Sequence, residues 1–209
     1  MILKAKHNFI IYPFFKWYSG FIIKRDFSSI SVIGDLKDKQ RPILLISNHI
    51  SWWDGFWAMY LNVTVLKRKF HFMMLEEQLR KFWFFNYSGG FSVNKKSKSV
   101  VETLHYTSEL LKDEKNMVLI FPQGEIQSIN NQNIRFENGL GHILKQKENN
   151  IQVLFLVNLI DYFSNRKPGI YMHIQEYKEL AFDMKSIQES YIEFYAQSVE
   201  KQKIVNNVK

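Results

Sequence analysis

Apolar residues along this chain fall into short runs, separated by stretches in which apolar and polar positions alternate with helical spacing. Seven of the runs have the length and the β-branched or aromatic content of strands. The predicted strands are Ser29–Ile33, Ile43–Ser47, Phe70–Leu75, Gly90–Val93, Met117–Phe121, Val153–Leu159 and Gly169–Tyr177. The predicted helices are Trp52–Leu61, Glu76–Phe85, Ser99–Lys112, Gly139–Lys147 and Met184–Gln202.

Strands that alternate with helices predict an α/β fold, in which helices flank one mostly parallel or mixed sheet. The chain of 209 residues is long enough for one such layered domain. No internal repeat, low-complexity segment or linker rich in Pro or Gly divides it. We therefore expect a single folded domain over residues 29–209.

The first 28 residues differ from the rest of the chain in composition. Aromatic and aliphatic residues are dense between Phe9 and Ile23, Lys16 interrupts this run, and Pro13 is expected to bend it. The run falls short of the roughly 20 apolar residues of a spanning helix and lacks a signal-peptide cleavage site. Aromatic rings and lysines both favour the lipid headgroup level, so residues 1–28 are predicted to be an interfacial membrane anchor, a helix or helix pair in one leaflet. The alternative is an ordinary N-terminal helix packed on the core.

Composition restricts both the chemistry and the partners. The chain has no cysteine, which excludes disulfides, thiolate metal sites and thiol nucleophiles. A net charge of +8 predicts an acidic partner: nucleic acid, an anionic membrane, or an acidic carrier or substrate. Aromatic residues cluster here with aliphatic residues instead of alternating with lysine and arginine, which favours membrane lipids and argues against nucleic acid.

A histidine and an aspartate five residues apart follow the strand Ile43–Ser47. Loops at the carboxyl ends of buried strands collect catalytic groups, and His49 lies at this point. Ser51 is predicted to cap a helix that begins at Trp52, which places Asp54 in its first turn. An aspartate hydrogen-bonded to Nδ1 would leave Nε2 of His49 free to accept a proton from a hydroxyl.

Two later loops could complete a site. The strand that ends at Phe121 is followed by Pro122, Gln123, Gly124 and Glu125, and a glycine loop of this kind can present backbone N–H groups to an oxyanion. Gly89 and Gly90 precede a short strand, and Lys95 and Lys96 follow it, a pattern that could hold an anion or form a simple turn. Because no histidine or carboxylate set has metal-ligand spacing, no metal is predicted.

These stretches, taken in order, resemble the motif blocks of the glycerolipid acyltransferase family. Residues 48–54 are similar to its Asn-His-x4-Asp block, residues 89–93 to its glycine block, residues 121–124 to its Phe-Pro-Glu-Gly block and residues 153–157 to its later apolar block. Residues 135–139 also look like the Phe-x-x-Gly element that often follows the third block. The resemblance extends from about Ile43 to Val157, and the ordered set is far more specific than any one block.

The resemblance implies an α/β acyltransferase at residues 29–209, peripheral or monotopic on the cytoplasmic face of the cell membrane. His49 would be the general base, Asp54 its orienting partner, and an acyl thioester, from acyl-CoA or acyl carrier protein, the donor. No other cofactor is expected, and the oligomeric state is left open. The residues predicted to bind substrate are Asn48, Gly90, Lys95, Lys96, Phe121, Pro122, Gln123, Gly124 and Glu125.

The third block departs from the family pattern. Members usually continue Glu-Gly-Thr-Arg, whereas this chain has Gln123, Gly124, Glu125 and Ile126. Losing an arginine that could bind a phosphate is not a conservative change. The acceptor could therefore be 1-acyl-glycerol-3-phosphate or another lysolipid, or instead a glycolipid or other lipid without phosphate.

Two alternatives to a lipid acyltransferase stay open. A serine hydrolase could pair the histidine with Ser47 or Ser51, although no Gly-x-Ser-x-Gly elbow is present. A basic membrane-binding domain without enzymatic activity is the other alternative.

Overall fold

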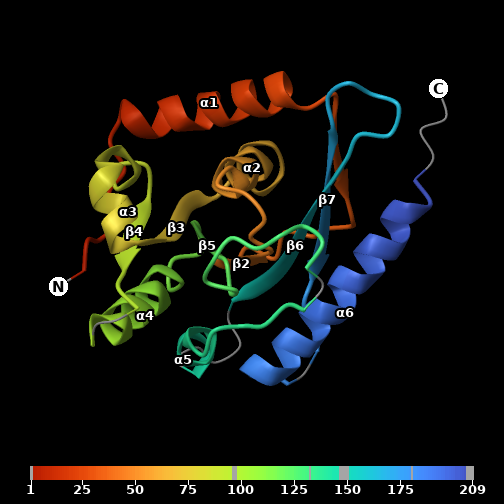
Figure 1. Ribbon diagram of the computed structural model, residues 1–209. Coiled ribbons are helices and arrows are strands. Elements are labelled where there is room, and N and C mark those ends of the chain that lie inside the picture. Colours follow the sequence, from red (N-terminus) through yellow and green to blue (C-terminus); the bar gives the residue numbers. More distant parts are fainter. Residues whose placement is uncertain (1, 96–97, 132, 146–150, 180, 206–209) are drawn as a thin grey trace.

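A seven-stranded sheet forms the centre of the computed structural model, which describes residues 2–95, 98–131, 133–145, 151–179 and 181–205. The strands are β1 (Ser29–Ile33), β2 (Ile43–Ser47), β3 (Lys69–Leu75), β4 (Gly90–Val93), β5 (Asn116–Ile120), β6 (Gln152–Asp161) and β7 (Gly169–Glu176). They lie in the order β1-β7-β6-β2-β5-β3-β4 (Figure 1). Neighbouring strands are parallel except for β6 and β7, which are antiparallel. The predicted α/β fold with a mixed, mostly parallel sheet is confirmed.

Helices cover both faces of this sheet. They are α1 (Ile11–Asp26), α2 (Asp54–Leu61), α3 (Glu76–Lys81), α4 (Ser99–Leu110), α5 (Gly139–Lys145) and α6 (Met184–Lys203). Helices α1 and α2 lie on one side of the sheet, and α4, α5 and α6 lie on the other (Figure 1). Alternate side chains of each central strand enter the two apolar layers, so that Leu44 and Val118 pack with the second group of helices, and Leu45 and Leu119 with the first.

Apart from shifts of one to three residues at some ends, the elements differ from the predicted ones at three places. Helix α2 begins at Asp54, two residues late, because the preceding turn uses the Asp54 side chain. The predicted helix Glu76–Phe85 is two pieces, since Phe82 leaves the helical region (φ −108°, ψ 59°) before a 3₁₀ turn over Trp83–Phe85. A π-helical turn, Asn62–Leu66, extends α2 and was not predicted.

The N-terminal segment is fastened to the sheet before α1 begins. Backbone hydrogen bonds join Lys6 to Asn86, Asn8 to Tyr87 and Ser92 to Leu3. Helix α1 then runs as one helix through Pro13, contrary to the expected bend. Pro13 stands at the third position of the helix, where a backbone N–H has no intrahelical acceptor to lose.

Helix α1 has two contrasting faces. Ile22 and Ile23 are buried, and Phe15 packs on Phe84 and Phe85, with ring centroids 5.7 and 5.3 Å away. The opposite face carries the exposed apolar side chains of Phe14, Trp17 and Phe21, and Ile10, just before the helix, is exposed as well. No helix in the described part of the chain is long and apolar enough to cross a membrane.

Candidate active site

The site lies where β2 and β5 end side by side. Ile46 of β2 pairs with Ile120 of β5 in parallel register, so the chain leaves both strands at the same edge of the sheet. His49 follows β2, and Phe121 follows β5. Their rings stack with centroids 4.0 Å apart and planes 10° from parallel. This is the edge at which open α/β sheets bind their ligands.

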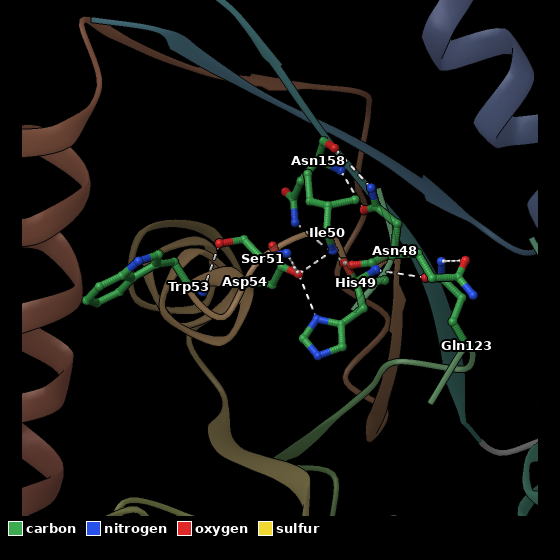
Figure 2. Close-up of polar contacts among 10 residues, drawn as sticks. Asn48, His49, Ile50, Ser51, Trp53, Asp54, Gln123 and Asn158 are labelled. Carbon is green, nitrogen blue, oxygen red and sulfur yellow. Dashed lines mark hydrogen bonds and ion pairs between the residues drawn. The ribbon is translucent and has the colours of Figure 1, made fainter. Parts of the chain in front are cut away.

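His49 and Asp54 are in contact as predicted. Nδ1 of His49 lies 2.8 Å from Oδ2 of Asp54, and Figure 2 shows the far side of the imidazole ring pointing away from the carboxylate. The Asp54 side chain is completely buried, whereas that of His49 is 20% exposed. The carboxylate therefore fixes the ring, and the other ring nitrogen, Nε2, is left for chemistry.

The Asp54 carboxyl also shapes the backbone around it. Oδ2 accepts hydrogen bonds from the N–H groups of Ile50 (2.8 Å) and Ser51 (3.0 Å), while buried Oδ1 has no partner among the described residues. Burial raises the pKa of Asp54, and the hydrogen bonds from His49, Ser51 and Ile50 oppose that rise. The same oxygen thus orients the imidazole and closes the turn before α2.

Both polar ends of the Asn48 side chain, predicted to contact substrate, are hydrogen-bonded to β6. Its side chain is buried; Nδ2 donates to the carbonyl oxygen of Asn158 (3.0 Å), and Oδ1 accepts from the Asn158 N–H (2.9 Å). These two bonds, drawn in Figure 2, attach the His49 loop to β6. Because both ends of the amide are used, we assign Asn48 to the support of the site.

Gln123 is likewise used within the protein. Its Oε1 accepts the His49 N–H (2.8 Å), and its Nε2 donates to Oε1 of Gln127 (2.8 Å). The backbone N–H of Gln127 donates in turn to the His49 carbonyl oxygen (2.8 Å). Both backbone groups of His49 are therefore held by the loop after β5. The role of Gln127 was not predicted, because a single glutamine in a loop belongs to no recognisable sequence motif.

The turn at Gly124 brings a lysine into the site. Gly124 has φ +70° and donates its N–H to the Phe121 carbonyl, so this N–H is used by the turn. Nζ of Lys95 lies 2.9 Å from the Gly124 carbonyl oxygen and 3.0 Å from Oε1 of Glu137. The positive φ favours glycine at residue 124, and a Cβ there would lie 2.4 Å from the present position of Nζ, so that a larger residue would displace the lysine ammonium group. Lys96, the other predicted cation, lies outside the described residues.

The remaining predicted residues fall into two groups. Pro122 and Glu125 line a cavity beside His49, as do Phe121, Gly124 and Lys95. Gly90 does not; it is buried in β4, where a Cβ would lie 2.8 Å from the Phe85 carbonyl oxygen and 2.9 Å from the Phe72 ring. We interpret Gly90 as a packing residue for this reason.

The cavity has a volume of about 610 Å³, within the range of small-molecule sites. Most of its lining is aliphatic or aromatic, and His49 is one of the few polar groups in it. These features define the protein as an α/β enzyme with a histidine–aspartate pair at the carboxyl edge of its sheet, next to an apolar cavity.

The family follows from comparison with known proteins. The family model described as acyltransferase matches residues 29–156, more than half of the chain. The chain therefore belongs to this family and is an acyltransferase, as the ordered motif blocks indicated, and the alternative of a domain without enzymatic activity is removed.

A solved structure supports the same fold. The chain is similar to the 1-acyl-sn-glycerophosphate (LPA) acyltransferase PlsC from Thermotoga maritima, with a TM-score of 0.62 and 19% sequence identity over 92% of this chain and 80% of that one. No curated protein matches the sequence significantly. At 19% identity, this likeness is evidence for the fold alone.

Proposed function

We propose that the protein transfers a fatty acyl group from an acyl thioester to the hydroxyl group of a lipid, with His49 as the general base. The observation that carries the proposal is the 2.8 Å contact between Nδ1 of His49 and buried Asp54, made at the wall of an apolar cavity. Nε2 accepts the proton of the acceptor hydroxyl while its oxygen attacks the thioester carbonyl carbon. The thiolate then leaves and takes that proton from His49.

Donor and site fit each other in this proposal. The thioester comes from acyl-CoA or acyl carrier protein, both acidic partners that suit a chain with net charge +8. The N–H groups of Glu125 and Ile126 have no acceptor among the described residues, and they follow Gly124 directly. We assign the developing oxyanion to this part of the loop. Neither Ser47 nor Ser51 is hydrogen-bonded to His49, so a hydrolase triad gains no support.

The direct test is acyl transfer by the purified protein. It is incubated with a labelled acyl thioester and a panel of lysophosphatidate, other lysolipids, diacylglycerol and glycolipids, and products are identified by mass. An acylated lipid that forms only with protein present supports the proposal. Hydrolysis of the thioester to free fatty acid, with no lipid of the panel acylated, contradicts it.

We further propose that the exposed face of α1 rests on the cytoplasmic surface of the membrane. Replacing Phe14, Trp17 and Phe21 together by serine is expected to weaken binding to anionic vesicles roughly a hundredfold. Each side chain is about half exposed or more and would lose about 1 kcal/mol of burial in lipid. Vesicle flotation measures the change, with Val101→Ser, an exposed apolar residue on α4, as the control. Unaltered flotation of the triple variant would show that α1 is only a packing helix.

The acceptor is proposed to need no phosphate monoester. Ile126 lines the cavity and is 50% exposed, at the position where family members usually have arginine. Ile126→Arg is expected to raise kcat/KM for lysophosphatidate about tenfold relative to a glycolipid or dephosphorylated acceptor, because it adds a charged hydrogen-bond donor. Ile126→Gln, which adds a polar side chain without the charge, is the control. A wild type that already prefers lysophosphatidate strongly, with no gain in the arginine variant, would overturn this assignment.

A further inference from the structure

The loop between β6 and β7, residues 162–168, reaches the end of α1. Figure 1 shows this loop beside the C-terminal end of the helix. Nζ of Lys167 donates to the Arg25 carbonyl oxygen (2.6 Å), and the Ser28 N–H donates to the Pro168 carbonyl oxygen (2.8 Å). The Arg25 carbonyl lies in the last turn of α1, where carbonyl groups lack intrahelical donors, so the lysine ammonium supplies one. These bonds hold the loop and the helix together as one unit.

The tip of this loop presents two aromatic side chains. Tyr162 is 60% exposed, and Phe163, whose ring meets the Tyr171 ring edge-on with centroids 6.1 Å apart, is still 43% exposed. The Asn165 N–H donates to the Tyr162 carbonyl oxygen (2.8 Å) and closes a tight turn, in which Phe163 has a φ of +44°. Glycine adopts such a φ freely, whereas a residue with a side chain is strained. A phenylalanine held in this conformation at the surface points to a use for its ring outside the core.

Basic side chains adjoin these two rings. The loop and the last turn of α1 together carry four exposed cations: Lys24, Arg25, Arg166 and Lys167. Two carboxylates adjoin them in sequence. Asp26 pairs with Arg25 (2.7 Å), and half-buried Asp161 accepts a hydrogen bond from Nε2 of Gln202 (2.8 Å). Exposed positive charge therefore prevails here, and aromatic rings beside lysine and arginine are typical of surfaces that contact lipid headgroups.

We infer that the loop between β6 and β7 is a second membrane contact, which binds the anionic surface of a lipid bilayer together with α1. This inference rests on the proposed association of α1 with the membrane and extends it. Phe14, Trp17 and Phe21 form a stripe with helical spacing on the outer face of α1. Lys24, three residues after Phe21, continues this stripe towards the loop. One bilayer surface can therefore meet the apolar stripe, the cations and the two rings of the loop.

The link between the loop and α1 determines how the two contacts combine. Because the loop is hydrogen-bonded to the helix, it reaches the bilayer without a further loss of translational freedom once α1 is bound. The contribution of the loop should therefore multiply the affinity that α1 provides.

Single cysteines can report on the surroundings of each site, because the chain has no cysteine of its own. A nitrobenzoxadiazole label on Phe163→Cys is expected to brighten and to shift to shorter wavelength when vesicles of equal parts phosphatidylglycerol and phosphatidylcholine are added. Lipids brominated close to the headgroup should quench it. A label on Phe21→Cys reports on α1 itself. Ile192→Cys, at a partly exposed apolar residue of α6 on the other side of the sheet, is the matched control and should stay in water.

Three results would overturn the inference. The label at residue 163 could stay in water while the label at residue 21 enters lipid, which would leave α1 as the contact without the loop. If neither label enters lipid, the proposed contact of α1 fails as well, whereas the proposed acyl transfer is judged separately by its products. A wavelength shift at residue 163 that grows with protein concentration and needs no vesicle would show a contact between copies of the chain instead.

Removal of charge gives an independent measurement by vesicle flotation. Arg166→Gln and Lys167→Gln together are expected to weaken binding to the same anionic vesicles roughly twentyfold, since each cation close to an anionic surface contributes a factor of about five. Glutamine at residue 167 can still donate to the Arg25 carbonyl, so the loop keeps its link to α1. Lys178→Gln and Lys185→Gln, two exposed lysines at α6 and before it, are the control of equal charge. An equal loss in both double variants would show a response to net charge alone and would contradict a local contact.

Discussion

Replacing His49 with alanine is expected to lower the rate of acyl transfer by a factor of about 10² to 10⁴ while the protein stays folded. Among the described residues, His49 is the only histidine that lines the cavity, so no second imidazole can take over its proton transfer. Its loss removes one hydrogen bond to Asp54 and the stacking on Phe121, at a side chain that is already 20% exposed. Initial rates at saturating donor, together with circular dichroism, measure both effects.

The matched control is His105→Ala. His105 is 61% exposed on α4 and does not line the cavity, so its removal should leave the rate unchanged. Transfer within a few-fold of wild type by folded His49→Ala would exclude this histidine as the base.

Changing Asp54 to asparagine is expected to slow transfer by a factor of about 10² to 10⁴ and to lower the free energy of unfolding by about 1–3 kcal/mol. An amide oxygen placed at the Oδ2 position could still accept the hydrogen bonds from His49, Ile50 and Ser51. The negative charge that stabilises protonated His49 would be gone, and the amide nitrogen would occupy the buried Oδ1 position without a partner.

Asp54→Ala separates the two effects. It leaves the N–H groups of Ile50 and Ser51 without their acceptor as well, so it should be less stable than Asp54→Asn by denaturant unfolding but no more active. Asparagine at residue 54 with wild-type activity would show that the carboxylate charge has no part in the reaction.

The sheet could be predicted because most of its strands are buried on both faces and appear in the sequence as uninterrupted apolar runs. The contact between His49 and Asp54 could be predicted for a related reason. Five residues across a strand exit and a first helical turn leave few geometries, so local sequence is enough to bring the two side chains together.

Contacts between distant segments could not be predicted. Asn48 and Asn158 are 110 residues apart, and nothing local indicates that one amide will pair with the backbone of the other. The start of α2 was misplaced because Ser51 and Asp54 close a turn before the helix: the Ser51 hydroxyl accepts the Trp53 N–H, and Asp54 accepts the N–H groups of Ile50 and Ser51. The cavity is lined by residues from five helices, α1 to α5, and three strands, β3, β4 and β5, and no single stretch of sequence encodes their packing.

The loop after β5 holds the His49 backbone by hydrogen bonds, and these bonds affect how the acceptor preference could change in evolution or by design. Ile126, which faces the acceptor in our proposal, lies between Gln123 and Gln127, the residues that hold the two backbone groups of His49. Exchanging the whole loop for that of a relative would alter recognition and catalysis together. A new acceptor is therefore more readily reached by single changes at residues 125 and 126, with both glutamines retained, than by transplanting the segment.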